Sequence, residues 1–449
     1  MENRGDHSHL QQRKKRRLVL FPQPLQGHIN PMLQLASILY HKAGFSITII
    51  HTNFNSPNSS SYPHFSFRSI PDGLSETEAS TADLIAFSVL LNVKCVVPFQ
   101  DCLAELLGGG GDDDDVACLI TDANWYFTQA VADSLKLPRI VLCPTSICFF
   151  NTVAAPPMQE FYFNVHTDFQ FETPVLEIQT RDPENINRFI KNIVKQTKAS
   201  SGIIWNSFQE LEELALTNLK QEFPIPHFLI GPFHKYFPAS SSSLLAQDQT
   251  SISWLDKQPP KSVIYVSFGS LIGVNETEFQ EIAWGLANSK LPFLWVVRPG
   301  LVQGTEWLEP LPKNFLEMID GRGHIVKWAP QQEVLDHSSV GAFWTHCGWN
   351  STLESICEGV PMICGQPCFG DQLVNARYVS DVWRFGLHLE KKLERGEIER
   401  AIRRVIREAE GQKMRERIMI LKDKMDICLT RGGSSYQSLE SLTNYIMSF

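Results

Sequence analysis

The chain has 449 residues, of which 43% are hydrophobic and 20% charged, so it can form two or three packed domains and is neither disordered nor fibrous in composition. Apolar runs such as Phe293–Val297 fall far short of the roughly 18 residues that span a bilayer, which excludes a polytopic membrane protein. The net charge of −9 argues against broad, non-specific binding to nucleic acid.

The cysteines and the N-terminal segment bear on where the protein resides. The ten cysteines lie singly and no C-x-x-C pair occurs, which favours reduced thiols over a disulfide framework. Residues 1–17 are polar and end in the basic run Arg13–Arg17, and the apolar stretch Leu18–Phe21 is too short for a secretory signal. We therefore expect a polar basic tail on a cytoplasmic protein, with a nuclear-localisation signal as the alternative for the basic run.

The first region alternates strands with helices, which predicts a parallel sheet. Asn30 as cap and Pro31 as first residue predict the start of a helix that stops at Gly44, so Pro22–Ile29 before it is expected to be a loop. A second helix is expected over Ala123–Leu135. The predicted strands are Arg17–Phe21, Phe45–Thr52, Val116–Thr121, Arg139–Cys143 and Gly202–Asn206.

The second region begins near Ser262 and repeats this alternation, which predicts a second parallel sheet. The predicted strands are Val263–Phe268, Phe293–Arg298, His324–Lys327, Val340–Thr345 and Pro361–Cys364. The predicted helices are Glu276–Ser289, Ser351–Glu358, Asp371–Trp383, Glu397–Glu410, Lys413–Leu429 and Ser435–Met447.

Two segments are low in complexity. The best linker candidate contains the serine run Ser240–Ser243 and the prolines Pro259 and Pro260. The second segment, four glycines followed by Asp112–Asp115, holds a formal D-x-D pattern, which some metal-dependent sugar transferases use. Because it follows the glycines and precedes a strand, we interpret it as a solvated loop.

The stretch Trp328–Gln372 carries the chemistry. A buried strand ends at His346, and Gly348 lets a ligand approach the backbone where Asn350 and Ser351 open a helix. Free N–H groups and the positive end of the helix dipole favour a diphosphate there, without lysine or a metal. The flat face of Trp328 suits a base, Glu354 suits ribose hydroxyls, and Asp371 with Gln372 suits sugar hydroxyls. Taken singly, the tryptophans could equally be core residues and Asn350-Ser351 a helix cap.

Read as a whole, this block resembles the C-terminal signature of plant UDP-sugar-dependent glycosyltransferases. The resemblance extends to Gly27–Pro31, to Ser267–Ser270 and to the helices from Val379 to the end. Leu119–Asp122 and Gly202–Phe208 are similar to the group that includes the steviol-glycoside glucosyltransferases.

The resemblance implies an α/β fold of the GT-B class, in which two Rossmann-like, doubly wound domains face each other across a cleft. We expect an acceptor-binding domain over 18–238, a linker over 239–260, a UDP-sugar-binding domain over 261–432, and a last helix over 433–449 that returns to the first domain. We also expect a monomer that binds a UDP-sugar and a lipophilic small molecule, with no nucleic acid, no membrane span, no metal and no resident cofactor.

The resemblance also implies roles for individual donor-site residues. Trp328 would stack on uracil, whose edge would meet the backbone of Ala329, while Gln331 and Glu354 would hold the ribose. The phosphates would be held by His346, Asn350, Ser351 and Ser270, and the sugar by Trp349, Asp371 and Gln372. The block is one residue longer than the family usually has, at Gly365-Gln366, so the loop before Asp371 is altered.

A sugar transfer also needs a base. His28 follows the first strand and Asp122 ends a later one, so both are expected at the carboxyl edge of the first sheet. From spacing alone, a backbone-bonded loop histidine and a helix-capping aspartate are the simpler interpretation. The resemblance instead identifies them as the catalytic pair, in which an imidazole removes a hydroxyl proton and a carboxylate stabilises the imidazolium.

The expected reaction is one inverting displacement, in which a hydroxyl or carboxyl of a terpenoid, terpenoid glycoside or phenolic receives glucose and becomes a β-glucoside. Within the family a glutamine at the end of the block goes with UDP-glucose and a histidine often goes with galactose, so Gln372 implies glucose. The acceptor wall is predicted from apolar and hydroxyl positions, with plain core as the alternative for most of them. These positions are Leu25, Phe87, Leu90, Leu91, Trp125, Thr145, Ser146, Phe149, Phe150 and Phe161.

Two other functions compete with this one. A nicotinamide-dependent oxidoreductase would also use Rossmann-like domains, but Pro22–Gly27 carries one glycine rather than G-x-G-x-x-G. A non-catalytic sugar-nucleotide-binding protein would keep the donor site, although the presence of both His28 and Asp122 speaks against it.

Overall fold

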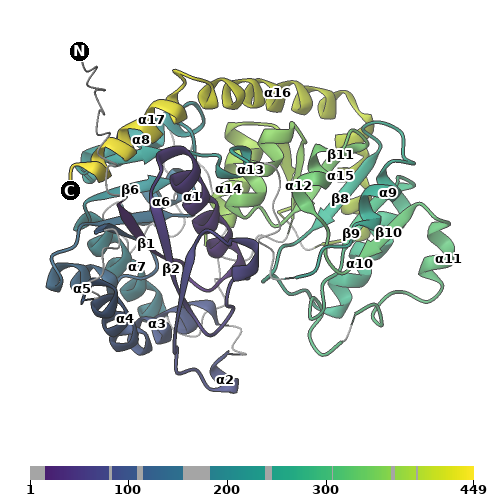
Figure 1. Cartoon of the computed structure of the whole chain (residues 1–449). Coiled ribbons are helices and arrows are strands. Elements are labelled where there is room, and N and C mark those ends of the chain that lie inside the picture. Colours follow the sequence, from purple (N-terminus) through teal and green to yellow (C-terminus); the bar gives the residue numbers. More distant parts are fainter. Residues whose placement is uncertain are drawn as a thin grey trace, which may run out of the picture.

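Two parallel β-sheets with flanking helices make up the two halves of the computed structural model (Figure 1). The structure describes residues 16–79, 83–108, 115–154, 183–237, 245–305, 307–365, 370–390 and 393–449. The sequence segments Asp112–Asp114 and Gln366–Phe369 and the predicted wall residue Phe161 lie outside these ranges.

Within the described residues, the first sheet has seven parallel strands in the order β3-β2-β1-β4-β5-β6-β7. These strands are β1 (Arg17–Phe21), β2 (Ser46–Thr52), β3 (Ser66–Ile70), β4 (Val116–Asp122), β5 (Arg139–Cys143), β6 (Gly202–Trp205) and β7 (His227–Leu229). The accompanying helices are α1 (Gln26–Ala43), α2 (Glu76–Ala79), α3 (Leu84–Lys94), α4 (Val96–Gly108), α5 (Thr128–Ser134), α6 (Ile147–Ala154), α7 (Pro183–Lys198) and α8 (Gln209–Glu222), with short 3₁₀ turns η1 (Ser59–Ser61) and η2 (Phe233–Lys235).

The second sheet has six parallel strands in the order β10-β9-β8-β11-β12-β13 over the ranges that the structure describes. They are β8 (Val263–Ser267), β9 (Phe293–Val296), β10 (Gly323–Val326), β11 (Val340–Thr345), β12 (Met362–Cys364) and β13 (Gly386–His388). Its helices are α9 (Thr250–Leu255), α10 (Glu276–Ser289), α11 (Phe315–Ile319), α12 (Gln331–Asp336), α13 (Trp349–Glu358), α14 (Gln372–Arg377) with the π-helical turn η3 (Tyr378–Val382), α15 (Arg395–Arg407), α16 (Ala409–Leu429) and α17 (Ser434–Met447).

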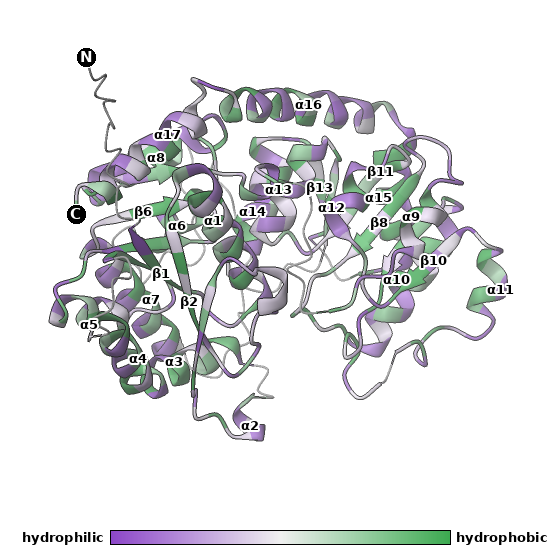
Figure 2. Cartoon of the chain, viewed as in Figure 1, coloured by the Kyte–Doolittle hydropathy of each residue, from purple (hydrophilic) through white to green (hydrophobic). Residues whose placement is uncertain are grey.

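The central strands are continuous apolar runs because helices exclude water from both faces of a parallel sheet. Every residue of β5, β8 and β11 is buried, and Figure 2 shows the hydrophobic strands inside each half. Helix α10 begins with a capping box, in which Asn275 accepts from the Glu278 N–H and Glu278 accepts from the Asn275 N–H. Local sequence therefore sets where such elements begin, and apolar pattern sets their burial.

Both sheets reverse their strand order next to the first strand of each domain. The reversal lies between β1 and β4 in the first sheet and between β8 and β11 in the second. Ligands of doubly wound sheets bind outside the carboxyl ends of the strands at such switch points. The segments that follow these four strands therefore mark where a site is expected.

Helix α1 begins earlier than the sequence predicted. Gln26 is its first residue, so Asn30 and Pro31 lie inside the helix and His28 is on its first turn rather than in a loop. Pro31 has no N–H to donate to the carbonyl of Gly27, four residues earlier. Asn350 Nδ2, from the second domain, donates to that carbonyl at 2.8 Å. A tertiary hydrogen bond thus satisfies the carbonyl that the proline leaves open, which sequence could not reveal.

The last three helices join the two halves. Helix α16 runs above both of them, and α17 then lies over the first sheet (Figure 1). Leu439, Leu442 and Ile446 of α17 pack into the core of the first domain, and the Tyr445 hydroxyl donates to the Ser201 carbonyl at 2.8 Å. The chain therefore ends on the domain in which it begins.

Several other expectations need correction. The helix predicted over Ala123–Leu135 is reduced to α5, because residues 123–127 form turns after β4. The segment predicted as a linker contains α9, whose Leu255 is fully buried. Sequence reasoning also missed several elements, among them β3, α3, α4, α7, α8, α12 and β13.

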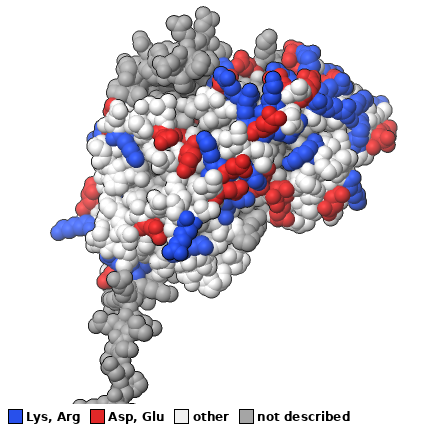
Figure 3. Space-filling model, turned by 90° about the horizontal axis from the view of Figure 1, so that it is seen from above, with Lys and Arg blue, Asp and Glu red and all other residues white. Residues whose placement is uncertain are grey.

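The outer surface carries both signs of charge. Seen from above, lysine and arginine are interspersed with aspartate and glutamate (Figure 3). On α15, Arg403 and Arg404 pair with Glu399 and Glu410. No single helix within the described ranges is long and apolar enough to cross a membrane, and the α3–α4 pair reaches the required length only across a 50° bend.

Candidate active site

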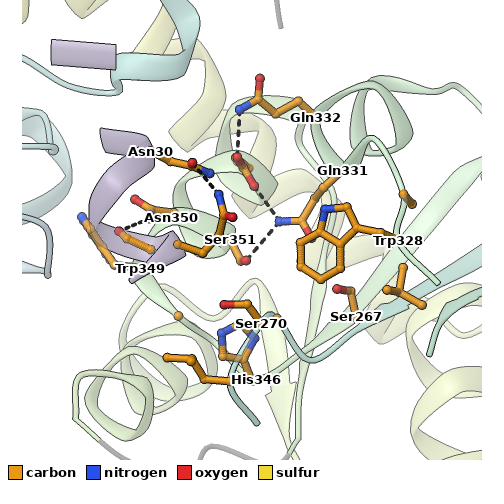
Figure 4. Close-up of a pocket in the computed structure, with 18 of the residues that line it drawn as sticks. Asn30, Ser267, Ser270, Trp328, Gln331, Gln332, His346, Trp349, Asn350 and Ser351 are labelled. Carbon is orange, nitrogen blue, oxygen red and sulfur yellow. Dashed lines mark hydrogen bonds between the residues drawn. The ribbon is translucent and has the colours of Figure 1, made fainter. Parts of the chain in front are cut away.

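A cleft of about 420 Å³ lies where the carboxyl edges of the two sheets face each other. All of the predicted donor-site residues line it, together with His28, Leu25 and Thr145 from the first domain. Figure 4 shows several of them pointing into one space. The cleft also has polar lining residues that sequence reasoning missed, namely Gln26, Asn30, Gln247, Gln249, Tyr265, Ser267, Gln332 and Glu333.

The amino end of α13 forms one wall of the cleft. Gly348 occupies the N-cap position and has no side chain to cap the first turn. The Trp349 N–H donates to the Asp371 carboxylate. Asn350 and Ser351, next in the first turn, face the cleft (Figure 4). The first turn and the helix dipole therefore favour an anionic group here.

His346 follows β11 and lies tightly between two glycines. A Cβ at Gly269, whose φ is +72°, would stand 2.7 Å from His346 Cε1, and a Cβ at Gly348 would stand 2.7 Å from Nε2. Burial, reinforced by the nearby Arg298, lowers the pKa of His346 to about 4. The imidazole is therefore neutral near pH 7 and has one N–H, for which the Ser267 carbonyl competes with a ligand.

A pre-arranged network holds the side chains predicted to bind ribose. Gln331 Nε2 donates to Ser351 Oγ at 3.1 Å and to Glu354 Oε2 at 2.6 Å, and Gln332 Nε2 donates to Glu354 Oε1 at 3.0 Å. Burial raises the pKa of Glu354, whereas the two glutamine donors lower it. These bonds tie α12 to α13 and hold the carboxylate of Glu354, which lines the cleft.

Trp328 is half-buried at the opposite end of the cleft, where one face of its ring lies against the core cluster that includes Tyr265 and Val326. Its carbonyl accepts a hydrogen bond from the Asp248 N–H at 2.9 Å. This bond brings Gln247 and Gln249 to the rim. The segment read as a linker from its composition therefore belongs to the wall of the cleft.

Trp349 lines the cleft and also contacts the first domain. Its side chain is 2% exposed and packs in a cluster with Phe208 and Leu353. The indole N–H donates to the Asn206 carbonyl of the first domain at 2.8 Å. This bond joins the two domains and occupies the indole donor, and the predicted contact of Trp349 with the sugar stays a prediction.

The predicted base and its carboxylate meet on the first domain. His28 Nδ1 and Asp122 Oδ2 are 2.7 Å apart, with Asp122 fully buried and His28 20% exposed. Asp122 Oδ1 accepts from the Asn124 N–H at 2.9 Å, which fixes the carboxylate. Burial alone would lower the pKa of His28, but the charge and hydrogen bond of Asp122, helped by Asp371, raise it above its ordinary value. The pair leaves Nε2 available for a proton from a ligand.

Asp371 lies across the cleft from this pair. Burial raises its pKa to about 6, while a hydrogen bond from Asn375 and the charge of His28 lower it. Gln372, the next residue, is 5% exposed and also lines the cleft. A carboxylate and a histidine that influence each other thus border the space between the anion-binding turn and the first domain.

Most of the residues predicted to form the acceptor wall are not among the described residues that line the cleft. Leu91 and Trp125 are fully buried, and Trp125 stacks on Phe21 in the core. Phe87 and Phe150 are 3% exposed and pack on Phe54 and Trp205. Phe87, Leu91 and Phe150 are core because α3 and α6 turn them inward, and Trp125, which lies in the turns after β4, stacks on Phe21. Leu90 and Phe149 are half-buried outside the described lining, and Ser146 is fully buried.

The fold and the cleft define a two-domain α/β protein of the GT-B class, with the amino end of a helix facing a His–Asp pair. A solved structure of UGT2 from Phytolacca americana with UDP-2-fluoro-glucose and pterostilbene superposes with a TM-score of 0.81 at 27% identity, covering 96% of this chain and 100% of that one. A family model described as UDP-glucoronosyl and UDP-glucosyl transferase matches residues 221–424.

Relatives of known family cover nearly the whole chain. It is 52% identical to UDP-glycosyltransferase 76B1 of Arabidopsis thaliana, over 96% of this chain and 98% of that relative. It is 50% identical to UDP-glycosyltransferase 76G1 of Stevia rebaudiana, over 97% and 98%. The chain therefore belongs to the UDP-glycosyltransferase family, and the oxidoreductase alternative finds no support in these comparisons.

Proposed function

We propose that the protein transfers glucose from UDP-glucose to a hydroxyl or carboxyl of a lipophilic small molecule, such as a terpenoid, terpenoid glycoside or phenolic, and forms a β-glucoside. The observation that carries the proposal is the His28–Asp122 pair, 2.7 Å apart, on the opposite wall of the cleft from the amino end of α13. UDP-sugar binding is supported by the related structure with UDP-2-fluoro-glucose.

In the proposed step, His28 Nε2 takes the acceptor proton while the acceptor oxygen bonds to the anomeric carbon. The bond from that carbon to the β-phosphate oxygen breaks, and its electron pair leaves with UDP. Attack opposite the departing group turns an α-linked donor into a β-linked product. The buried Asp122 carboxylate stabilises the imidazolium that forms. A carboxylate in hydrogen-bond contact with the imidazole therefore suits this step.

The leaving group gains negative charge as it departs. We propose that the first turn of α13, with Ser351 and the neutral His346, stabilises this charge without a metal ion. Donors already held in place do not need to reorganise at the moment of reaction. Asp371 and Gln372 border the proposed sugar position and are assigned to the glucose hydroxyls.

The decisive experiment is a screen of acceptors with UDP-glucose, read by mass spectrometry for addition of one hexose. The α- or β-configuration of the product by NMR tests the inverting step, and chelator tests the metal-free proposal. Comparison of UDP-glucose with UDP-galactose and UDP-xylose tests the donor. UDP binding without any product or UDP release across the panel would favour a sugar-nucleotide-binding protein instead.

A further inference from the structure

The carboxylate assigned to the sugar is held by a side chain that sequence reasoning passed over. Asn375, on α14, is 1% exposed and lies one helical turn after Asp371. Its Nδ2 donates to Asp371 Oδ2 at 2.9 Å and to the Cys347 carbonyl at 3.0 Å. Its Oδ1 accepts from Ser146 Oγ of the first domain at 2.9 Å.

The orientation of this amide follows from its partners. An asparagine side chain has two N–H donors on nitrogen and an acceptor oxygen. A carboxylate and a peptide carbonyl only accept, so both must meet the nitrogen, and the oxygen is left to face Ser146. Ser146 must then donate its hydroxyl hydrogen, since Oδ1 cannot. All three contacts therefore depend on one another.

The contacts join the three parts that a transfer reaction must bring together. Cys347 lies between His346 and the anion-binding turn of α13. Ser146 directly follows Thr145, which lines the cleft from the first domain, and Asp371 interacts electrostatically with His28. Ser146 was predicted to touch the acceptor, but its hydroxyl is buried and used at the domain boundary.

We propose that Asn375 is a positioning residue, which aims the Asp371 carboxylate at the donor sugar and makes that aim depend on contact with Ser146 of the first domain. This inference rests on the proposed function in that it takes Asp371 to bind the sugar. Asn375 touches neither reacting atom and acts only through Asp371.

The inference predicts a specific pH signature. The Asn375 hydrogen bond stabilises the ionised form of Asp371, so its loss raises the pKa of that carboxyl above about 6. Two titratable groups face Asp371, His28 from α1 and the thiol of Cys347, which follows β11. The Trp349 N–H from α13 also donates a hydrogen bond to the carboxylate. Removing Asn375 alters the surroundings of Asp371 and leaves these other groups in place.

The test measures affinities of the full chain for UDP-glucose and for UDP by calorimetry between pH 5.5 and 8.5. For Asn375→Ala we expect the pH at which UDP-glucose affinity is half lost to rise by about one unit, which is the scale of one hydrogen bond to a charged group. UDP lacks the glucose, so its affinity should stay within about twofold.

Ser146→Ala removes the contact with the first domain and retains Asn375. We expect a smaller upward shift of the same midpoint, and a double variant no different from Asn375→Ala alone. Ser289→Ala is the matched control, because it deletes another buried hydrogen bond of the second domain, Ser289 Oγ to the Leu286 carbonyl at 2.7 Å, far from Asp371. It should lower thermal stability without moving the midpoint.

An unchanged midpoint in Asn375→Ala would overturn the inference. If that variant does not fold, an unchanged midpoint in Ser146→Ala overturns it instead. Wild-type protein that binds UDP-glucose but transfers nothing to any acceptor would refute the proposed catalysis while the binding measurements still test Asn375. Wild-type protein with no affinity for UDP-glucose would refute both.

Discussion

The two walls of the cleft are built in different ways. On the second domain, the donor wall comes mostly from one continuous block, Trp328–Gln372, in which a strand, a turn and a helix start follow one another. On the first domain, the described lining comes from two separate segments, residues 25–30 at the start of α1 and residues 144–145 after β5. A wall made from one segment can be read from its local sequence, whereas a wall assembled from distant segments depends on how they pack.

This difference also separates the chemistry. The second domain presents N–H groups and neutral side chains that suit a fixed anionic ligand, and the first domain presents a His–Asp pair that suits proton transfer. Substitutions on the two walls should therefore change different measurements, and the following experiments test that division.

The largest effect is expected for His28→Ala. Loss of a general base lowers turnover by roughly 10²–10⁴-fold, while UDP affinity should stay near wild type because His28 lies on the other wall. Steady-state kinetics and calorimetry together check this. Wild-type turnover would remove His28 from the mechanism, and a large loss of UDP affinity would break the division between the walls.

Asp122→Asn tests the partner of the base. The carboxylate raises the pKa of His28 against a burial effect that lowers it. A base must be deprotonated, so activity is lost as pH falls through that pKa. Without the negative charge, we expect the acid limb of the kcat/KM profile to move to lower pH, with turnover also reduced. An acid limb that stays in place or moves upward would contradict the electrostatic role.

Trp328→Ala tests the donor wall. Stacking of a base on an aromatic ring contributes about 1–3 kcal/mol, so UDP affinity should fall roughly 5- to 150-fold, measured by calorimetry. The matched control is Trp254→Ala, which removes a partly buried tryptophan that stacks on His324 and does not line the cleft. Equal loss in both variants would show that general destabilisation, rather than stacking, is responsible.

Gly269→Ala tests the seating of His346. The positive φ of Gly269 costs an alanine about 1–2 kcal/mol, and the new methyl would displace the imidazole that it meets at 2.7 Å. We expect UDP affinity about tenfold weaker, by the same free-energy scale, with the pKa of His28 unchanged. Gly304→Ala, also at positive φ but with open space around it, separates backbone strain from displacement of His346. An equal loss of UDP affinity in Gly304→Ala would contradict the role assigned to the seating of His346.

The smallest effect is expected for Trp349→Phe. The phenylalanine keeps apolar packing but leaves the Asn206 carbonyl without the indole N–H. Chemical denaturation should show a loss of about 1–2 kcal/mol in the free energy of unfolding, with UDP-glucose affinity close to wild type. A selective loss of UDP-glucose affinity over UDP affinity would support the predicted sugar contact and show that Trp349 does more than join the two domains.

Much of the fold could be predicted because its signals are local. The strands Arg17–Phe21, Arg139–Cys143 and Val340–Thr345 have the predicted bounds, since each is an apolar run between turn residues. The predicted donor residues gather for the same reason. The wall predictions at Trp125 and Phe150 fall on buried core residues, because an apolar side chain fits a core as well as a pocket and only the tertiary fold decides between them.

The sequence by itself determined the alternation of strands and helices, the helix start after β11 and the family to which the chain belongs. Only the tertiary structure decided which polar groups satisfy one another across the domain boundary. The Gly27 carbonyl left open by Pro31 meets Asn350, and Ser146 meets Asn375 rather than a ligand. These partners are far apart in the chain, and a hydrogen bond forms only where folding brings a donor within about 3 Å of an acceptor.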